Sequence, residues 1–249
     1  MKQTTRTILA AFVAVAMVAF AGCSKEEING GSANNGNNGG GNGGGNGGGT
    51  ETAGWVDLGL PSGLLWATCN LGADAPEEYG DYYAWGETAT KSVYNRSTYR
   101  YCTVDAEGNP STLTKYNTST DYGTVDNLTT LEAMDDAATQ RLGNGVRTPT
   151  ADEWRELINN TTVEWTTQNG VNGRRFTAAN GNSLFLPAAG GRLGSELLYA
   201  GIGGDYWSSS LYTDGPYYAW EFSFNSGGQL VSYSSRDYGH TVRPVRSAL

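Results

Sequence analysis

The stretch DYWSSSLYTDGPYYAWEFSFNSGGQLVSYSSRDYGH, residues 205–240, contains the clearest strand pattern in the chain. Trp220, Phe222 and Phe224 recur at every second position, with polar or charged residues between them. A period of two is that of a strand with one buried face. The NSGGQ segment that follows, residues 225–229, forms turns readily and leads into a second strand. We therefore predict a C-terminal hairpin whose tryptophan and phenylalanines build a core.

The composition of this stretch is typical of a contact surface. Half of its 36 residues are Tyr (6), Ser (8) or Gly (4), and none is Lys. Tyr offers a large rigid face at low entropy cost, and Ser and Gly adapt around it. Tyr217 and Tyr218 follow a Gly-Pro turn, and no apolar alternation continues after Val231, so this region is expected to be exposed. The alternative is that Tyr is present only because it suits strands.

We predict a ligand-binding surface on these C-terminal hairpins. If the surface lies elsewhere, the aromatic loop at 79–85 is the next candidate. The candidate ligand-binding residues are Trp207, Tyr212, Thr213, Asp214, Tyr217, Tyr218, Asn225, Ser226, Tyr233, Ser234, Ser235, Asp237, Tyr238 and His240.

Two helices are predicted upstream. The sequence TTLEAMDDAATQRLG places Leu131, Met134 and Ala138 on one face, and Gly143 is a stop signal. If its adjacent acids Asp135 and Asp136 lie on a helix, they point about 100° apart, so one should be buried and the other solvated.

The second helix, in RTPTADEWRELINN, has a sharper start. Thr150 and Glu153 have the spacing of a capping box, in which each side chain bonds the backbone of the other. Trp154, Leu157 and Ile158 then form the buried stripe.

The other segments read as short strands and loops. WVDLGLPSGLLWATCNLGA predicts two strands around a PSG turn, and EEYGDYYAWGE predicts a packed aromatic loop. Residues 88–128 lack periodicity and are predicted to be an irregular insertion. The Asn-Gly pairs at 169–170 and 180–181 predict hairpins, and HTVRPVR predicts a last strand with Val242 and Val245 in the core. Helices followed by antiparallel strands indicate an α+β fold.

The N-terminal region predicts export and a lipid anchor. Residues 1–22 have a basic start and an apolar run too short to span a bilayer, which indicates a signal peptide. The run ends in FAGC, which resembles the lipobox of bacterial lipoproteins and implies lipidation of Cys23; CSKEE resembles a surface-export signal. Residues 23–51 then form a flexible Gly/Asn-rich tether, and 52–249 form the ligand-binding domain.

The net charge of the chain limits the classes of partner that we expect. Without residues 1–22 the chain has 14 basic and 25 acidic residues, a net charge of −11. An acidic chain without a basic run is a poor nucleic-acid binder, so we do not expect nucleic acid as a partner. The expected partner is an external protein or glycan, and the expected membrane contact is the lipid anchor alone.

Eight blocks together resemble one family. They are VDLGLPSGLLWATCNLGA, EYGDYYAWGE, DDAA, RTPTADEWREL, NGNSLFLPAAGGR, YWSSS, AWEFSF and VRPVR, which span nearly all of 55–246. In order and spacing they are similar to the Fibrobacter succinogenes major paralogous domain of Bacteroidetes surface lipoproteins. RTPTADEW is also similar to a block of formylglycine-generating enzymes. The resemblance implies a C-type-lectin-like fold with two helices, a small twisted antiparallel sheet and long loops, displayed at the outer-membrane cell surface.

We expect no enzymatic activity. Formylglycine-generating enzymes work through cysteines late in the domain, and nothing after Cys102 could serve. His240 is the only histidine, so a serine triad has one candidate base, in a turn. The remaining alternative is a glycan-active enzyme, which would use paired acids. Its candidate acids are Asp135, Asp136, Asp74, Glu77, Glu78 and Asp81.

No cofactor and no metal site is predicted. The motifs by which C-type lectins hold sugar through calcium do not occur, and TDGP and EEYGD supply oxygen ligands without a calcium spacing. A structural calcium and a Cys69–Cys102 disulfide both stay open. The alternative to the disulfide is two separately buried thiols.

Two kinds of binding module remain. Some proteins of the resembled fold class are varied by diversity-generating retroelements, which randomise adenines in Asn-type codons ahead of an end that resembles VRPVR. Except for Trp207, every candidate ligand-binding residue can arise from such codons, whereas Trp207, Trp220, Glu221 and Gln229 cannot and would be scaffold. The other kind is a carbohydrate-binding adhesin of fixed specificity. A near-identical DNA copy and a reverse transcriptase beside the gene would favour the first.

Lipidation of Cys23 is directly testable. The Cys23→Ser variant should leave the membrane fraction, because several acyl chains anchor stably whereas none remains in the variant. Fractionation followed by immunoblotting measures this, and unchanged membrane retention would contradict the lipoprotein prediction.

Overall fold

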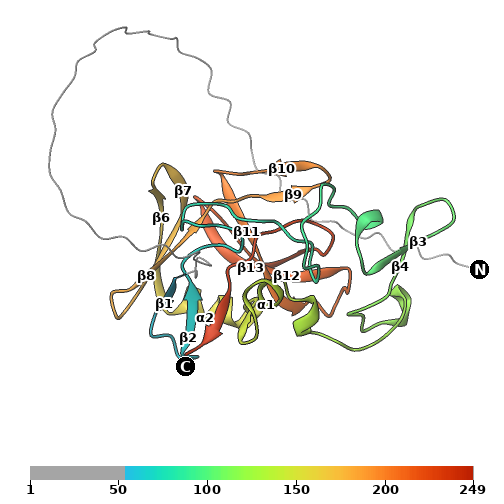
Figure 1. Ribbon diagram of the computed structural model, residues 1–249, viewed down its shortest axis with the longest axis horizontal. Coiled ribbons are helices and arrows are strands. Elements are labelled where there is room, and N and C mark those ends of the chain that lie inside the picture. Colours follow the sequence, from blue (N-terminus) through green and yellow to red (C-terminus); the bar gives the residue numbers. More distant parts are fainter. Residues whose placement is uncertain (1–53, 249) are drawn as a thin grey trace, which may run out of the picture. The chain divides into compact units, whose positions relative to one another are not determined.

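The computed structural model describes residues 54–248, which form small antiparallel sheets and two α-helices, an α+β arrangement (Figure 1). The helices are α1 (Ala137–Leu142) and α2 (Ala151–Asn159), with 3-10 turns η1 (Arg96–Thr98), η2 (Thr120–Tyr122) and η3 (Ala133–Asp135). The strands are β1 (Trp55–Asp57), β2 (Leu64–Ala67), β3 (Cys102–Val104), β4 (Pro110–Leu113), β5 (Val146–Arg147), β6 (Thr161–Gln168), β7 (Val171–Ala178), β8 (Ser183–Pro187), β9 (Gly191–Leu193), β10 (Glu196–Leu198), β11 (Gly203–Leu211), β12 (Tyr218–Asn225), β13 (Gly228–Ser235) and β14 (Val245–Ser247).

The first and last described strands meet in one sheet of order β1-β2-β14-β5. β14 pairs with β2 through Val245 and Trp66, and both side chains are fully buried. The predicted N-terminal strand pair and the predicted burial of Val242 and Val245 are therefore confirmed. The last strand is shorter than the HTVRPVR pattern suggested.

The Asn-Gly pairs close turns as predicted. Asn169 and Gly170 both have positive φ (48° and 84°), the geometry of the tight turn that suits a hairpin's twist, and they join β6 to β7. Gly181 (φ 87°) lies in the turn between β7 and β8. These three strands form a sheet at the opposite end of Figure 1 from the β3–β4 hairpin.

The C-terminal stretch forms the sheet β11-β12-β13, which separates two hydrophobic cores. Neighbouring residues on a strand point to opposite faces, so Tyr206 enters one core and Trp207 the other. Phe222 and Phe224 lie in the Tyr206 core, which confirms the predicted alternation. Trp220 lies on the same face but is only half-buried; it is near the start of β12, where Arg155 of α2 lies over its ring.

Helix α2 packs on that face of the sheet. Thr150 Oγ1 accepts from the Glu153 N–H and Glu153 accepts from the Thr150 N–H, so the predicted capping box is confirmed. Trp154 is fully buried: its ring stacks on Phe222 at 4.8 Å, and its Nε1–H donates to the Trp207 carbonyl.

The first predicted helix is shorter than expected. α1 begins only at Ala137 and ends before Gly143, which is the predicted stop. Met134 lies in η3 and is 64 % exposed, so its predicted place on a buried face is wrong. Asp135 and Asp136 are both buried, not one of the two, because Asp135 binds Lys115 and Tyr116 while Asp136 caps α1 and binds Thr148.

The second core is mostly aromatic. The segment EEYGDYYAWGE contributes Tyr82, Tyr83 and Trp85, all buried, which confirms the packed loop. This burial disfavours residues 79–85 as an alternative ligand surface, because three of the four rings in the loop face inward and Tyr79 is partly buried against the same core.

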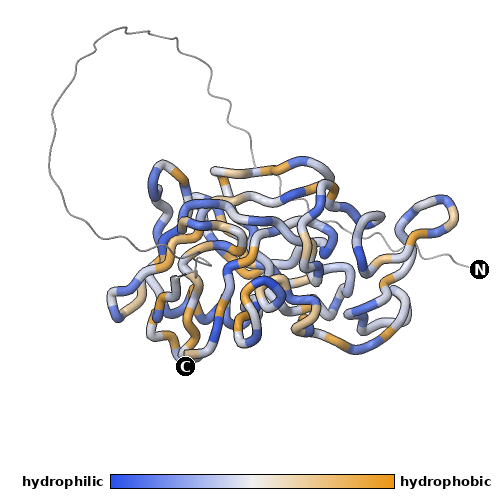
Figure 2. Tube along the Cα trace, viewed as in Figure 1, coloured by the Kyte–Doolittle hydropathy of each residue, from blue (hydrophilic) through white to orange (hydrophobic). Residues whose placement is uncertain are grey.

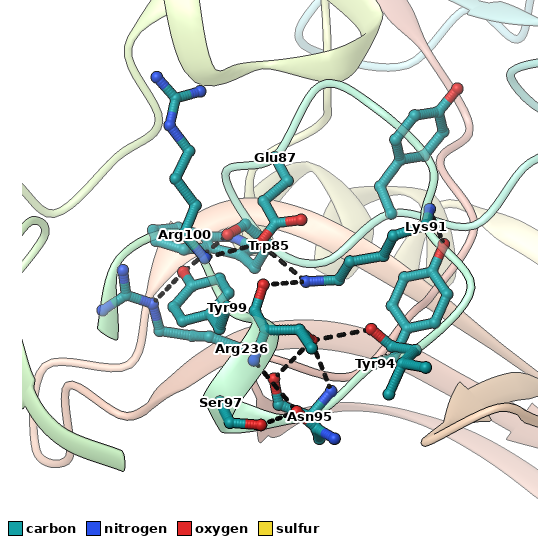
Figure 3. Close-up of polar contacts among 12 residues, drawn as sticks. Trp85, Glu87, Lys91, Tyr94, Asn95, Ser97, Tyr99, Arg100 and Arg236 are labelled. Carbon is teal, nitrogen blue, oxygen red and sulfur yellow. Dashed lines mark hydrogen bonds and ion pairs between the residues drawn. The ribbon is translucent and has the colours of Figure 1, made fainter. Parts of the chain in front are cut away.

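Residues 88–128 are largely irregular, as predicted, but they contain the unpredicted β3–β4 hairpin. Side chains fix this insertion to the domain (Figure 3). Lys91 Nζ donates to Glu87 and to the Thr98 carbonyl, and Asn95 and Thr98 form a capping box on η1. The Tyr99 hydroxyl donates to the Trp85 carbonyl.

Cys69 and Cys102 are both free thiols. Cys69 is buried two residues after the end of β2, beside the Thr68 hydroxyl, and Cys102 is half-buried in β3, where its Sγ–H donates to the Thr103 carbonyl. The disulfide alternative is therefore corrected in favour of two separate thiols. The predicted signal peptide, lipidated Cys23 and tether lie outside the described residues.

In the described part of the chain, no helix is long and apolar enough to cross a membrane. Figure 2 shows hydrophobic and hydrophilic residues interspersed along the tube over these residues.

The role of Trp154 can be tested by stability measurements. Trp154→Ala should lower the free energy of unfolding by about 3–5 kcal/mol, the usual range for an aromatic side chain deleted from a core. Met134→Ala is the control and should stay within about 0.5 kcal/mol, because Met134 is exposed. Denaturant melts measure both, and a loss of less than about 1 kcal/mol for Trp154→Ala would show that α2 does not depend on this ring.

Candidate functional site

Four aromatic side chains gather on the α2 face of the C-terminal sheet, at the end where β12 begins. We call them the aromatic platform: Tyr212, Tyr218, Trp220 and Tyr233. Tyr233 is 46 % exposed and Tyr218 is 38 % exposed, while Tyr212 and Trp220 are half-buried. The Tyr212 and Tyr233 rings stack with centroids 4.1 Å apart, and Tyr218 lies edge-on to Tyr233 at 5.4 Å.

Strand register creates the platform. Trp220 pairs directly with Tyr233 across β12 and β13, so both side chains point to one face. Leu211 pairs with Ala219 after a register shift in β11, and Tyr212, the next residue, stacks on Tyr233. The platform therefore rests on paired strands rather than on a loop.

The platform is a continuation of the core face of the sheet. The guanidinium of Arg155, on α2, lies 4.7 Å over the Trp220 ring, and Phe222, two residues further along β12, is fully buried. Thr213 and Asp214 are exposed in the adjoining turn. Partly exposed aromatic rings held in fixed positions can bind apolar or C–H surfaces of a partner.

Tyr217, another predicted contact residue, lies elsewhere. It is half-buried against the insertion, with the Arg96 guanidinium 4.1 Å over its ring and Tyr122 edge-on at 5.1 Å. Its hydroxyl donates to the Ser111 carbonyl. Tyr217 therefore joins the insertion to the C-terminal sheet.

Three further candidates do not join the platform either. Asn225 and Ser226 are exposed at the far end of the hairpin, about 20 Å away along the eight residues of β12. Ser235 is half-buried and donates to Asp237.

Three predicted contact residues, Trp207, Asp237 and His240, are buried, which corrects their assignment. Trp207 is 2 % exposed, because its ring packs in the aromatic core and its Nε1–H donates to the Tyr83 carbonyl. Asp237 is 5 % exposed, beneath Ser235 and 3.9 Å from Arg96 Nε.

The remaining candidates, Ser234, Tyr238 and His240, line an open pocket on the opposite face of the sheet. His240 was predicted to lie in an exposed turn, but it is 4 % exposed. The reason is that its backbone bridges to Tyr83 and its ring packs 4.2 Å from that of Trp207.

A buried charge pair lies under this pocket. His240 Nε2 is 3.0 Å from Glu221 Oε2, but the contact is not aligned as a hydrogen bond. Burial acts to lower the pKa of His240, but the contact with Glu221 and the charge of Asp205 outweigh it and hold this pKa above its ordinary value. Burial raises the pKa of Glu221, with His240 acting against the rise.

Sequence reasoning missed Arg155, Glu221 and Asp205 as parts of these sites. Arg155 follows Trp154 directly on α2, so a helical projection would have placed it near the edge of the buried face. The position of Glu221 between Trp220 and Phe222 indicated the opposite face of the strand, but nothing in the sequence showed that the face is covered.

The acids considered for catalysis make structural contacts. Glu77 binds Asn169, Glu78 caps the turn at Asp74, and Asp81 pairs with Arg141. Within residues 54–248, no group of three or more His, Cys, Asp or Glu side chains is placed to hold a metal ion.

No family model matches the chain, and neither a curated protein nor a solved structure is detectably similar to it.

The buried pair predicts how stability depends on pH. With a pKa above its ordinary 6.5, folded His240 contributes stability that is complete below about pH 6.5 and is lost as pH rises through the folded value. Burial also raises the pKa of Glu221 from its ordinary 4.5, so the stability that its proton contributes begins to be lost above about pH 4.5. Melting temperature should therefore fall from about pH 6.5 to about pH 9, below the range where tyrosines ionise.

Glu221→Gln should flatten this slope, because His240 then loses the charge that holds its proton. Glu164→Gln, which changes an exposed acid, is the control and should keep the wild-type slope. Equal slopes in all three proteins, measured by differential scanning calorimetry, would rule out this assignment.

Proposed function

We propose that this chain is a non-enzymatic, surface-displayed lipoprotein whose aromatic platform binds an external macromolecule, with an external protein as the favoured partner. The observation that carries the proposal is that Tyr218 and Tyr233 are exposed although they are supported by Tyr212, Trp220 and paired strands. Rings supported in this way lose little freedom on binding, which is the property that gives contact residues large binding energies.

The composition around the platform fits this function. Thr213 and Asp214 supply an exposed polar rim, and Arg155 supplies a positive charge beside the rings. A central aromatic group with a polar rim is the usual anatomy of a protein interface.

We extend the proposal to the finer fold and family. Two helices, small antiparallel sheets, terminal strands paired in one sheet and long loops support a C-type-lectin-like fold. Under this proposal the domain belongs with the Fibrobacter succinogenes major paralogous domains, anchored through Cys23 to the outer membrane. Tyr212, Tyr218 and Tyr233 are all residues that retroelement-randomised codons can yield, which supports a platform that varies between relatives on a constant scaffold.

A carbohydrate-binding adhesin of fixed specificity is the second candidate. Exposed stacked tyrosines also bind the apolar faces of sugars, so the platform itself does not separate the two. The two candidates differ in what the platform captures, which is what the experiment should measure.

The test is to screen the full chain on arrays of extracellular proteins and of glycans, and then to measure each hit with variants. Tyr218→Ala combined with Tyr233→Ala should weaken binding of a protein hit by about 2 kcal/mol or more, about 30-fold in Kd. The free energy of unfolding should change by no more than about 1 kcal/mol, because both rings are partly exposed.

Leu230→Ala is the matched control, because Leu230 is exposed on the opposite face of the same hairpin. Its binding should equal that of the wild type. A glycan hit lost in the double variant would favour the adhesin, and a hit of either kind that the double variant retains would exclude the platform as the site.

A further inference from the structure

Two of the long strands in the described chain, β6 and β13, have an open edge. The other strands of eight or nine residues are β7, β11 and β12. β7 and β12 lie in the middle of their sheets, and loop segments bond the free side of β11, as where the Trp207 N–H donates to the Thr241 carbonyl. β6 and β13 each pair with one strand only, and no isolated bridge among the described residues involves either of them.

The edge of β13 lacks the usual protection against other strands. Natural sheets protect open edges with charged residues, proline or bulges, because an exposed edge readily pairs with another strand. β6 carries Glu164, which pairs with Arg175. The sequence of β13, GQLVSYSS, contains no charged residue and no proline, and its eight pairs with β12 run without a register shift. β13 is therefore the less protected of the two edges.

The strand register shows which backbone groups of β13 face outward. Asn225 and Gly228 pair across a two-residue turn, so they form the hydrogen-bonded pair that closes the hairpin. Every second pair beyond it is bonded in the same way, and the residues between point their N–H and C=O groups away from β12. On β13 these residues include Gln229, Val231 and Tyr233, and no described backbone group bonds them on the open side.

The spacing of these groups fits an extended peptide. Donors and acceptors on the open side recur at every second residue, about 6.8 Å apart. Another extended backbone presents the complementary pattern, which is how peptides add to sheet edges. A helix does not, because its backbone groups bond one another.

The side chains beside the edge select the kind of segment. Tyr233 belongs to both β13 and the aromatic platform, and it is 46 % exposed. A residue of an added strand directly opposite Tyr233 would point to the same face, where aromatic and β-branched side chains pair favourably with it. Ser232 and Ser234 point to the other face and are small and uncharged, so that face accepts varied side chains.

Charge favours a partner other than a second copy of this chain. The chain has a net charge of −9, so two copies side by side would repel each other. An acidic segment of another protein would be repelled for the same reason. An uncharged or basic segment would not.

We infer that an extended, uncharged or basic segment of the external partner adds to β13 as a fourth strand of this sheet. It hydrogen-bonds to the backbone of Gln229, Val231 and Tyr233 and places an aromatic or β-branched side chain against the platform. The inference rests on the proposed function for the partner's being a protein, and it specifies how that protein is held.

The probe is a phage-displayed library of random peptides of about twelve residues, selected on the full chain. The best selected peptide, made synthetically, should bind with a Kd on the order of 10–100 μM, as expected for a small and transient contact. Methylating its backbone nitrogens one at a time should weaken binding about 10-fold or more at every second position of the bound segment, and little in between. The reason is that only alternate N–H groups of a strand face its neighbour.

Amide hydrogen exchange, measured by NMR, locates the bound peptide. Saturating peptide should slow exchange at the amides of Gln229, Val231 and Tyr233 about 10-fold or more, because each becomes hydrogen-bonded.

The open edge of β6 is the matched control. Gln168 and Val171 pair across another two-residue turn, so the same register argument makes Val163, Trp165 and Thr167 the outward residues of β6. Exchange at these three amides should not change when the peptide binds.

Alternation in the methylation scan, together with protection confined to β13, supports the inference. It is overturned if no peptide is selected, if the scan shows no alternation, or if the protected amides are those of β6. A dimer of the free chain in sedimentation equilibrium, with the β13 amides already protected, would overturn it too, because a second copy would then occupy the edge.

The platform is judged separately with the Tyr218→Ala, Tyr233→Ala double variant. If that variant still binds the peptide with the alternating pattern, the platform proposal fails and strand addition stands. If it loses a protein hit while no alternation is found, strand addition fails and the platform stands.

Discussion

Two buried arginines hold the C-terminal segment in place, and the positions of the sheet, the platform and the pocket depend on them. Arg236 is 1 % exposed and Arg243 is fully buried, and neither pairs with a carboxylate among the described residues. A buried guanidinium is tolerated only if its N–H groups are satisfied. Here the acceptors are mostly backbone carbonyl groups, which cannot be supplied until the surrounding loops have folded.

Arg236 connects the sheet to the insertion. Its guanidinium donates to the Tyr99 hydroxyl at 2.9 Å and to the carbonyl groups of Tyr116, Pro216 and Lys115, and it lies over the Trp85, Tyr99 and Tyr116 rings. Figure 3 shows Arg236 beside Tyr99 and Trp85. Arg243 connects the C-terminal segment to β2 and β8. It donates to Asn70 and to the carbonyl groups of Ala67, Thr68 and Phe185. Long loops thus acquire fixed positions without forming regular structure.

The sheet between these anchors has two different faces, which is why one short stretch can form two sites. On one face, Trp220 and Tyr233 continue the row of core aromatics out to solvent. On the other face, Glu221 and His240 lie under the open pocket that Leu198, Tyr199 and Ser234 also line. Within a strand of this stretch, alternate residues point to opposite faces and therefore belong to different sites. A surface defined as a continuous range of residues thus combines side chains from both faces.

Local patterns in the sequence were sufficient wherever the deciding contacts are close in the chain. The capping box of Thr150 and Glu153, the Asn-Gly turn at 169–170 and the Phe222/Phe224 alternation were predictable for this reason, and so was the α+β order. Met134 was mispredicted because the capping bond of Asp136 starts α1 later than periodicity suggests. Tyr217, Trp207, Asp237 and His240 were mispredicted as surface residues for a different reason. Their burial depends on Ser111, Tyr83, Arg96 and Glu221, which are distant in sequence and approach only when the insertion and the loop at 79–85 pack on the sheet. The sequence by itself thus determined the elements and the Tyr-rich stretch that carries the candidate sites. Only the tertiary structure decided which of those side chains reach solvent, because exposure depends on long-range packing that no local pattern records.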